Sequence, residues 1–184
     1  MSEASASIEK ISEQAKRGGK IIQQLRGYVQ RNEPMLMPVM LADVIRDALG
    51  MIDVHLRQHN ARLTFSVFGD PFYIIADAVQ VQQVIVNLVS NACESNGKSA
   101  GRRKQIDVLL TYGSSDAIMS VTDDGGGIPA GAAQRIFEPF FTTKPNGIGM
   151  GLAVCKSIVE FHGGQIWLTT DPTTFHIKLP KASQ

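Results

Sequence analysis

Two asparagines, Asn87 and Asn91, stand four residues apart, with the apolar Val84, Leu88 and Ala92 at neighbouring helical positions. Residues at this spacing share one face of a helix, and side-chain amides on an apolar face need polar partners. One interpretation is a pair of helix asparagines bonded to nearby backbone. The other is that the amide oxygen of Asn91 ligates Mg²⁺, a cation that takes few protein ligands and completes its shell with water and phosphate.

A carboxylate followed by glycines lies further along, in the sequence Val-Thr-Asp-Asp-Gly-Gly-Gly-Ile-Pro at 121–129. A strand-like pattern ends at Asp123, and a buried carboxylate can accept a hydrogen bond from an adenine amino group. Glycines such as Gly125 and Gly127 permit positive φ and close approach of the backbone to a ligand. An ordinary hairpin turn is the alternative because Asp-Gly is common in turns, but three consecutive glycines exceed what a turn needs.

A cluster of phenylalanines precedes Lys144 in the sequence Arg-Ile-Phe-Glu-Pro-Phe-Phe-Thr-Thr-Lys at 135–144. One interpretation is a satellite hydrophobic cluster under a loop. The alternative is a movable lid, anchored by its aromatic side chains, in which the hydroxyls of Thr142 and Thr143 and the ammonium of Lys144 reach phosphates.

Alternating glycines, Gly147, Gly149 and Gly151, come just before a helical apolar pattern. Backbone N–H groups at the start of a helix favour phosphate. The pattern is neither a P-loop nor a dinucleotide-binding fingerprint, because no Gly-Lys-Ser/Thr is present and no strand precedes it. Each of the four signals is modest alone. Together they predict one nucleotide pocket with a cation ligand, an adenine acceptor, a lid and a phosphate-binding helix start.

The elements that must position these residues follow from hydrophobic periodicity. Helices are predicted over residues 41–59, 77–95 and 152–162. Strands are predicted over residues 62–68, 72–76, 105–112, 117–122, 165–170 and 174–179. Because the strands come in pairs, the sheet should be mixed and largely antiparallel, with the helices on one face. This is a two-layer α/β sandwich of the α+β class.

Residues 1–33 form a separate predicted unit, and residues 34–184 form the domain with the pocket. Within residues 1–33, apolar or small residues recur every three or four positions, as in a coiled-coil seam. They are Ile8, Ile11, Ala15, Gly18, Ile22, Leu25 and Val29. A lone helix of this kind is marginal in water, so it must pack on the domain or on a second copy of the chain. Dimerisation is the favoured interpretation.

Composition and charge argue against several classes of function and location. The formal net charge of the 184 residues is +1, which argues against a nucleic-acid partner. The basic cluster at 102–104 is predicted to be a solvated loop. No apolar run approaches the ~20 residues of a membrane span, and the N-terminus lacks a signal-peptide pattern, so a cytoplasmic chain without membrane contact is expected. Cys93 and Cys155 should be buried small hydrophobes.

In order and in residue type, the four motifs resemble the catalytic domain of the sensor histidine kinases. That domain has the Bergerat-type ATP-binding fold shared with gyrase, the heat-shock chaperones of that fold and MutL. The matching residues are Asn87 and Asn91 (N box), Asp123, Gly125 and Gly127 (first glycine box), Phe137, Phe140 and Phe141 (F box), and Gly147, Gly149 and Gly151 (second glycine box).

The resemblance implies binding of ATP and Mg²⁺, with Asn91 on the metal and Asp123 on adenine. It implies catalytic roles for Asn87 and Lys144. The nucleotide-binding residues that it implies are Asn87, Asn91, Asp123, Gly125, Gly127, Ile128, Phe141, Thr142, Thr143, Lys144, Gly147, Gly149, Met150, Gly151 and Leu152.

Two departures from the family qualify this expectation. The family's phosphate-accepting histidine precedes Glu or Asp, whereas the four histidines here precede Leu56, Asn60, Gly163 and Ile177. Residues 1–33 resemble the second bundle helix, so the first is expected to be missing from this chain, which should not phosphorylate itself. The last hairpin, at 170–175, is shorter than usual and lacks the family's glycine, which should affect only the edge of the sheet.

The resemblance also implies a homodimer formed through residues 1–33 and, for a full-length kinase, a response regulator as partner. Where gyrase-type relatives have a catalytic glutamate this chain has Asn87, and an amide is a poor general base, so ATP hydrolysis should be slow. Two other functions stay open: a serine-directed kinase of the anti-sigma type, and a non-catalytic nucleotide-binding and dimerisation module.

Overall fold

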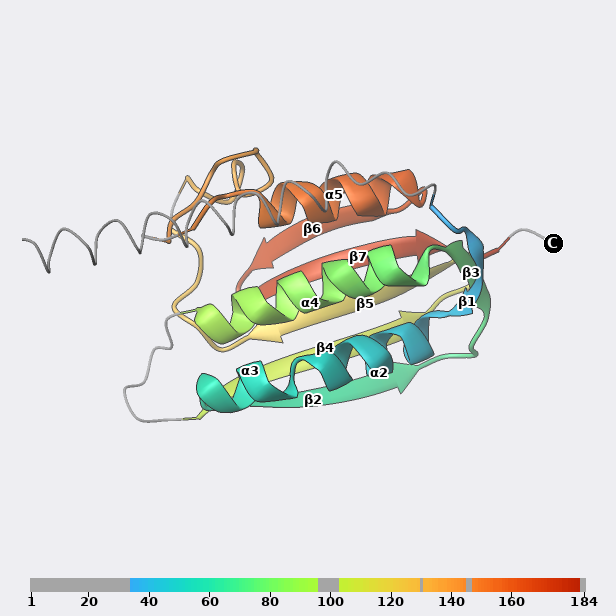
Figure 1. Cartoon of the computed structure of the whole chain (residues 1–184), viewed down its shortest axis with the longest axis horizontal. Helices are drawn as coiled ribbons and strands as arrows, with labels where there is room; N and C mark the ends of the chain where they lie inside the picture. The colour runs from blue at the N-terminus through green and yellow to red at the C-terminus, as the bar shows by residue number, and fades with distance from the viewer. Residues whose placement is uncertain (1–33, 96–102, 130, 145–146, 183–184) are drawn as a thin grey trace, which may run out of the picture. The chain divides into compact units, whose positions relative to one another are not determined.

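A five-stranded sheet with helices on one of its faces forms the core of the computed structural model (Figure 1). The structure describes residues 34–95, 103–129, 131–144 and 147–182. The predicted heptad helix at 1–33, with its role in dimerisation, lies outside these residues.

The large sheet has the strand order β2-β4-β5-β7-β6. Strand β2 pairs with β4 in parallel, and the other neighbours are antiparallel. The sheet is therefore mixed and largely antiparallel, as predicted. Its strands are β2 (Ala61–Phe68), β4 (Lys104–Tyr112), β5 (Asp116–Asp123), β6 (Gln165–Thr170) and β7 (Thr173–Pro180).

A second sheet, of two strands, shows that one expected strand pairing is wrong. The predicted strands 62–68 and 72–76 both exist but do not pair with each other. Strand β3 (Tyr73–Ala76) instead pairs antiparallel with β1 (Met37–Met40), which lies in a segment predicted only to be extended. Periodicity shows that a segment is extended, but its partner depends on the whole topology. Here β2 reaches its parallel neighbour β4 through a crossover that contains the next helix.

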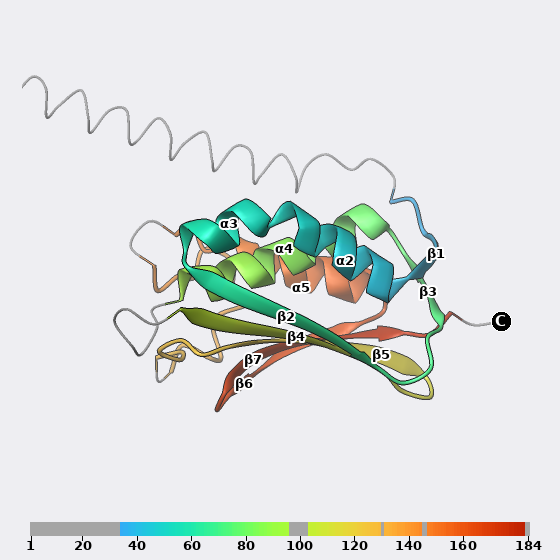
Figure 2. The same cartoon turned by 90° about the horizontal axis from the view of Figure 1, so that it is seen from below.

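Four helices are described, and α2, α4 and α5 lie side by side on the same face of the large sheet (Figure 2). They are α2 (Leu41–Met51), α3 (Asp53–Gln58), α4 (Ala78–Glu94) and α5 (Gly151–Phe161). The single helix predicted over 41–59 is wrong, because it breaks at Ile52. There the backbone N–H bonds to the carbonyl of Leu49, a tight last turn, and the break leaves both Ile52 and Leu56 in the core.

Helix α4 is the central element for function. One face buries Val81, Val84, Ile85, Leu88, Val89, Ala92 and Cys93. Both cysteines are buried, Cys155 in α5 included, as predicted. No helix among the described residues is both long enough and apolar enough to cross a membrane.

The N-terminal end of α4 is fixed by Asp77 and His162. The Asp77 carboxylate accepts hydrogen bonds from the backbone N–H groups of Val79 and Gln80, as an N-cap does. The Asp77 N–H donates to Nε2 of the buried His162 at 3.0 Å, and His162 Nδ1 lies 2.7 Å from the carbonyl oxygen of Ile158 in α5. This histidine therefore ties α5 to the start of α4.

Candidate functional site

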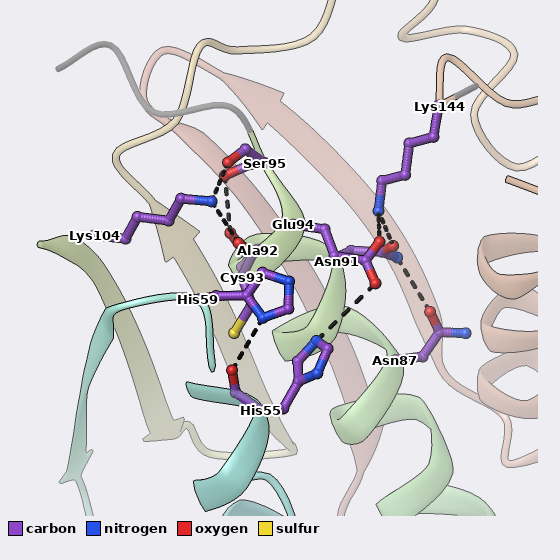
Figure 3. Close-up of polar contacts among 10 residues, drawn as sticks. All are labelled: His55, His59, Asn87, Asn91, Ala92, Cys93, Glu94, Ser95, Lys104 and Lys144. Atoms are coloured by element: carbon purple, nitrogen blue, oxygen red, sulfur yellow. Dashed lines mark hydrogen bonds and ion pairs between the residues drawn. The ribbon is translucent and has the colours of Figure 1, made fainter. Parts of the chain in front are cut away.

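The polar face of α4 carries the two asparagines near its C-terminal end (Figure 3). Asn91 Nδ2 donates to Asn87 Oδ1 at 3.1 Å, and both residues are partly buried. The amides therefore partly satisfy each other. The oxygen of Asn91 remains directed to other partners.

Lys144 supplies one of those partners. Its ammonium lies 2.8 Å from Asn91 Oδ1 and 2.6 Å from Glu94 Oε2. The segment that follows the phenylalanines thus returns to α4. Sequence reasoning missed Glu94, although its position three residues after Asn91 places it on the same helical face.

Asp123 ends strand β5 and meets the last turn of α4. Its side chain is buried, and Oδ1 accepts hydrogen bonds from the Gly125 N–H at 2.9 Å and from Ser95 Oγ at 3.0 Å. Burial raises the pKa of this carboxyl above its ordinary value, and the two hydrogen bonds oppose that rise. Among the described residues neither contact uses Oδ2, so this oxygen can accept a hydrogen bond from a ligand.

The start of α5 also lies against α4. A Cβ built on Gly151 would lie 2.7 Å from Asn87 Nδ2, so only glycine allows this close approach. Gly149 has φ +73°, and a Cβ there would overlap the backbone of Phe140. Met150, the N-cap residue, makes no side-chain hydrogen bond to the helix start. The first N–H groups of α5 are therefore not capped by that side chain.

The phenylalanines differ in their surroundings. Phe137 and Phe141 pack against the hydrophobic core, and the Phe137 ring meets Phe175 edge-on at 6.5 Å. The Arg135 guanidinium lies 4.6 Å from the centre of the Phe141 ring, a cation–π contact. Phe140 is 71% exposed with φ +66°. Two of the three aromatic side chains therefore anchor the segment, and the third faces solvent.

The remaining predicted residues lie around these contacts. Ile128 and Leu152 pack against the core. Thr142 and Thr143 are exposed, and Thr142 Oγ1 accepts a hydrogen bond from the Lys144 N–H at 3.1 Å. Gly147 approaches Thr142 closely. Gly127 has φ +82° and sits 3.9 Å, measured from a built Cβ, from Thr173 Oγ1.

The other three sequence segments meet the helix that carries the asparagines. Gly151 abuts Asn87, Lys144 binds Asn91, and Asp123 binds Ser95. The contacted residues are Asn87 and Asn91 in α4 and Ser95, its C-cap residue. They follow at intervals of four residues, so they lie along one side of the helix and its end. The structure thus brings the adenine, cation, lid and phosphate segments of the sequence analysis together.

Two basic residues predicted to be solvated have structural partners. The Lys104 ammonium binds the carbonyl oxygens of Cys93 and Ser95 (Figure 3). It places a cation at the C-terminal end of α4, where the helix dipole favours it. The Arg103 guanidinium donates to the carbonyl oxygen of Ala61 at 3.2 Å. The lysine supports the end of α4 that carries the site, and the arginine contacts the start of β2.

His55 lies next to the site from α3. Its Nε2 is 4.0 Å from Glu94 Oε1 and has no hydrogen-bond partner among the described residues. Burial, followed by the neighbouring His59, lowers the pKa of His55. No group of three or more His, Cys, Asp or Glu side chains in the described ranges could hold a metal.

A match to a known protein family shows which family this chain belongs to. The family described as "Histidine kinase-, DNA gyrase B-, and HSP90-like ATPase" matches residues 76–183, which include all four motifs. The chain belongs to this ATPase family. Its domain is accordingly an ATP-binding one, and the mixed sheet covered by helices is the fold of this family's histidine kinase domains.

Curated relatives in the family are sensor proteins. The chain is 36% identical over 183 residues to the sensor protein FixL of Bradyrhizobium diazoefficiens, covering 97% of this chain and 36% of that protein. It is 31% identical to the sensor histidine kinase TmoS of Ectopseudomonas mendocina, covering 97% of this chain and 19% of that protein. The chain therefore spans about a third or less of the length of these relatives.

Solved structures give the same result. The nucleotide-free catalytic domain of the histidine kinase ThkA superposes with a TM-score of 0.70 at 31% identity, covering 79% of this chain and 95% of that one. ThkA in complex with the response regulator protein TrrA gives a TM-score of 0.75 at 26% identity, covering 96% of this chain and 51% of that one.

Proposed function

We propose that this chain is the ATP-binding catalytic domain of a two-component sensor histidine kinase and transfers the γ-phosphoryl group of ATP to a histidine outside this chain. The observation that carries the proposal is the convergence of Gly151, Lys144 and Asp123 on one side of α4 and its C-cap residue Ser95. The names of the relatives, sensor proteins and sensor histidine kinases, support the same function.

Asp123 is the residue that recognises adenine. Gly125 and Ser95 hold its Oδ1, so Oδ2 accepts the adenine amino group. A buried carboxylate makes a strong acceptor for such a donor. A Cβ on Gly125 would overlap Asp123 Oδ1 and Ser95 Oγ, so glycine there lets the carboxylate and the serine lie against the backbone.

The start of α5 and Lys144 bind the phosphates. The start of α5 lies against the polar side of α4 at Gly151, and the dipole of α5 favours an anion there. The Lys144 ammonium adds a positive charge. Thr142 and Thr143 are exposed in the same segment and can donate hydroxyl hydrogen bonds to phosphate oxygens.

The residues present fit a magnesium ion. Asn91 Oδ1 already accepts a cation, because the Lys144 ammonium lies on it, and amide oxygen is a suitable Mg²⁺ ligand. Asn91 would hold the ion, with Asn87 orienting its amide. When bound, Mg²⁺ supplies positive charge that neutralises phosphate oxygens during phosphoryl transfer. Asn87 is no general base, so hydrolysis should be slow.

The partners of the full-length protein belong to the same proposal. The likeness to ThkA in its complex with TrrA supports a response regulator as the downstream partner. The proposal also includes a homodimer formed through residues 1–33. It places the protein in the cytoplasm, where ATP is available.

Phosphoryl transfer in trans tests this function. The chain is mixed with [γ-³²P]ATP, Mg²⁺ and a separate four-helix bundle that carries an acceptor histidine. We expect acid-labile label on the bundle and none on this chain. A bundle with its acceptor histidine replaced by alanine is the control, and Asn91→Ala in this chain should reduce transfer at least ~100-fold. ATP binding without any transfer would instead identify a non-catalytic nucleotide-binding module.

A further inference from the structure

We propose that Glu94 is a positioning residue that holds the Lys144 ammonium on Asn91 Oδ1 until a nucleotide arrives with its metal. The inference rests on the function proposed above and extends it to a residue outside the four motifs. It gives Lys144 two successive partners. The first is the pair of acceptors on α4, and the second is the phosphates of the nucleotide.

The contacts define the first position (Figure 3). Lys144 Nζ lies 2.8 Å from the amide oxygen of Asn91 and 2.6 Å from the carboxylate of Glu94. Asn91 and Glu94 are three residues apart, so α4 presents both acceptors to one ammonium. In the described part of the chain the other basic group near Glu94 is His55, at 4.0 Å, and its lowered pKa favours the neutral ring.

The metal must compete with this ammonium. The amide oxygen that Lys144 occupies is the one expected to ligate Mg²⁺. An amide oxygen has two lone pairs, but an ammonium and a divalent cation on one oxygen would stand within about 5 Å and repel each other. Binding of the metal with its nucleotide therefore displaces Lys144.

The strength of the contact suits such an exchange. The side chains of Lys144 and Glu94 are 38% and 43% exposed. An ion pair this accessible to water is weak, so a metal that binds with the nucleotide can break it. The carboxylate of Glu94 nevertheless gives the ammonium a charged partner that Asn91 alone would not provide. Replacing Glu94 by glutamine keeps the shape of the side chain and removes this charge.

The metal ratio measures the competition. We define it as the Kd for ADP in EDTA divided by the Kd for ADP in saturating Mg²⁺, both from calorimetry on the whole chain. Glu94→Gln should raise the ratio roughly two- to five-fold, because the metal no longer has to break the ion pair. Coulomb attraction alone predicts the opposite sign, because removing a carboxylate near a divalent cation weakens its binding.

A double-mutant cycle isolates the role of Lys144. In a Lys144→Met background, Glu94→Gln should leave the ratio unchanged or lower it, because no ammonium remains to be released. Glu160→Gln is the matched control. Glu160 pairs with Lys156 near the far end of α5, at 3.8 Å, and its loss should leave the ratio unchanged.

Three outcomes overturn the inference. One is a ratio that falls or does not change in Glu94→Gln. Another is an equal rise in the Lys144→Met background, which would show that Glu94 acts without the lysine. In both cases ADP still binds and the proposed function stands. The third is that neither the wild type nor any variant binds ADP, in which case the proposed function fails and the inference fails with it.

Discussion

Helix α4 packs seven side chains into the core on one face and carries Asn87, Asn91 and Glu94 on the other. On the core face, Ile85, Leu88 and Val89 are all 0% exposed. On the polar face the contacts are hydrogen bonds and ion pairs between partly exposed side chains. Burial of apolar surface holds the first set whether or not a ligand is present. The second set can be exchanged for ligand contacts at small cost, so one helix serves both as a rigid support and as an adaptable surface.

The largest expected effect separates the two faces directly. Leu88→Ala should lower the free energy of unfolding by about 2–5 kcal/mol, because it leaves a cavity in the core. Asn91→Ala should change it by about 1 kcal/mol or less, since the lost hydrogen bonds are partly exposed and alanine favours the helix. Urea unfolding without nucleotide measures both. Equal losses from the two variants would contradict the comparison.

A smaller effect concerns Asp123, which contacts Ser95 at the C-terminal end of α4. Burial raises the pKa of its carboxyl above the ordinary value of 3.8, so the folded state holds this proton more tightly than the unfolded state. The contribution of this group to stability therefore falls as the pH rises from about 3.8 through the raised value. Asparagine can still accept the hydrogen bonds of Gly125 and Ser95 but cannot ionise.

The substitution Asp123→Asn should therefore be at least as stable as the wild type at neutral pH. Its advantage should shrink as the pH falls through the raised value and should be gone below about 3.8. Urea unfolding at a series of pH values checks this, with Asp70→Asn, at an exposed carboxylate, as the control. A stability difference that does not depend on pH would contradict the assigned cause.

Much of the fold could be predicted from the sequence because its signals are local. The apolar period of α4 and the glycine pair after α5 placed both helices to within one or two residues. The hairpins β4–β5 and β6–β7 followed from short turns between alternating segments. The break at Ile52 could not be predicted, because no proline marks it. The separation of β2 from β3 depends on partners far along the chain.

The site divides in the same way. Order and residue type were enough to predict which segments take part, since glycines and carboxylates at these spacings have few other uses. Ser95 and Glu94 were missed because their roles depend on which segments reach the end of α4. The position of the Lys144 ammonium could not be predicted either. The sequence predicted a phosphate contact, whereas the ammonium lies on the amide expected to bind the metal.

One comparison of melting temperatures tests most directly whether the four segments form a single adenine-nucleotide pocket. Mg²⁺-ADP at about 100 times its Kd should raise the melting temperature of the wild-type chain by roughly 5–10 °C. Asp123→Asn, folded and no less stable, should lose most of that rise because the adenine acceptor is weakened. An unchanged melting temperature in the wild type, or the same rise in both proteins, would contradict the account.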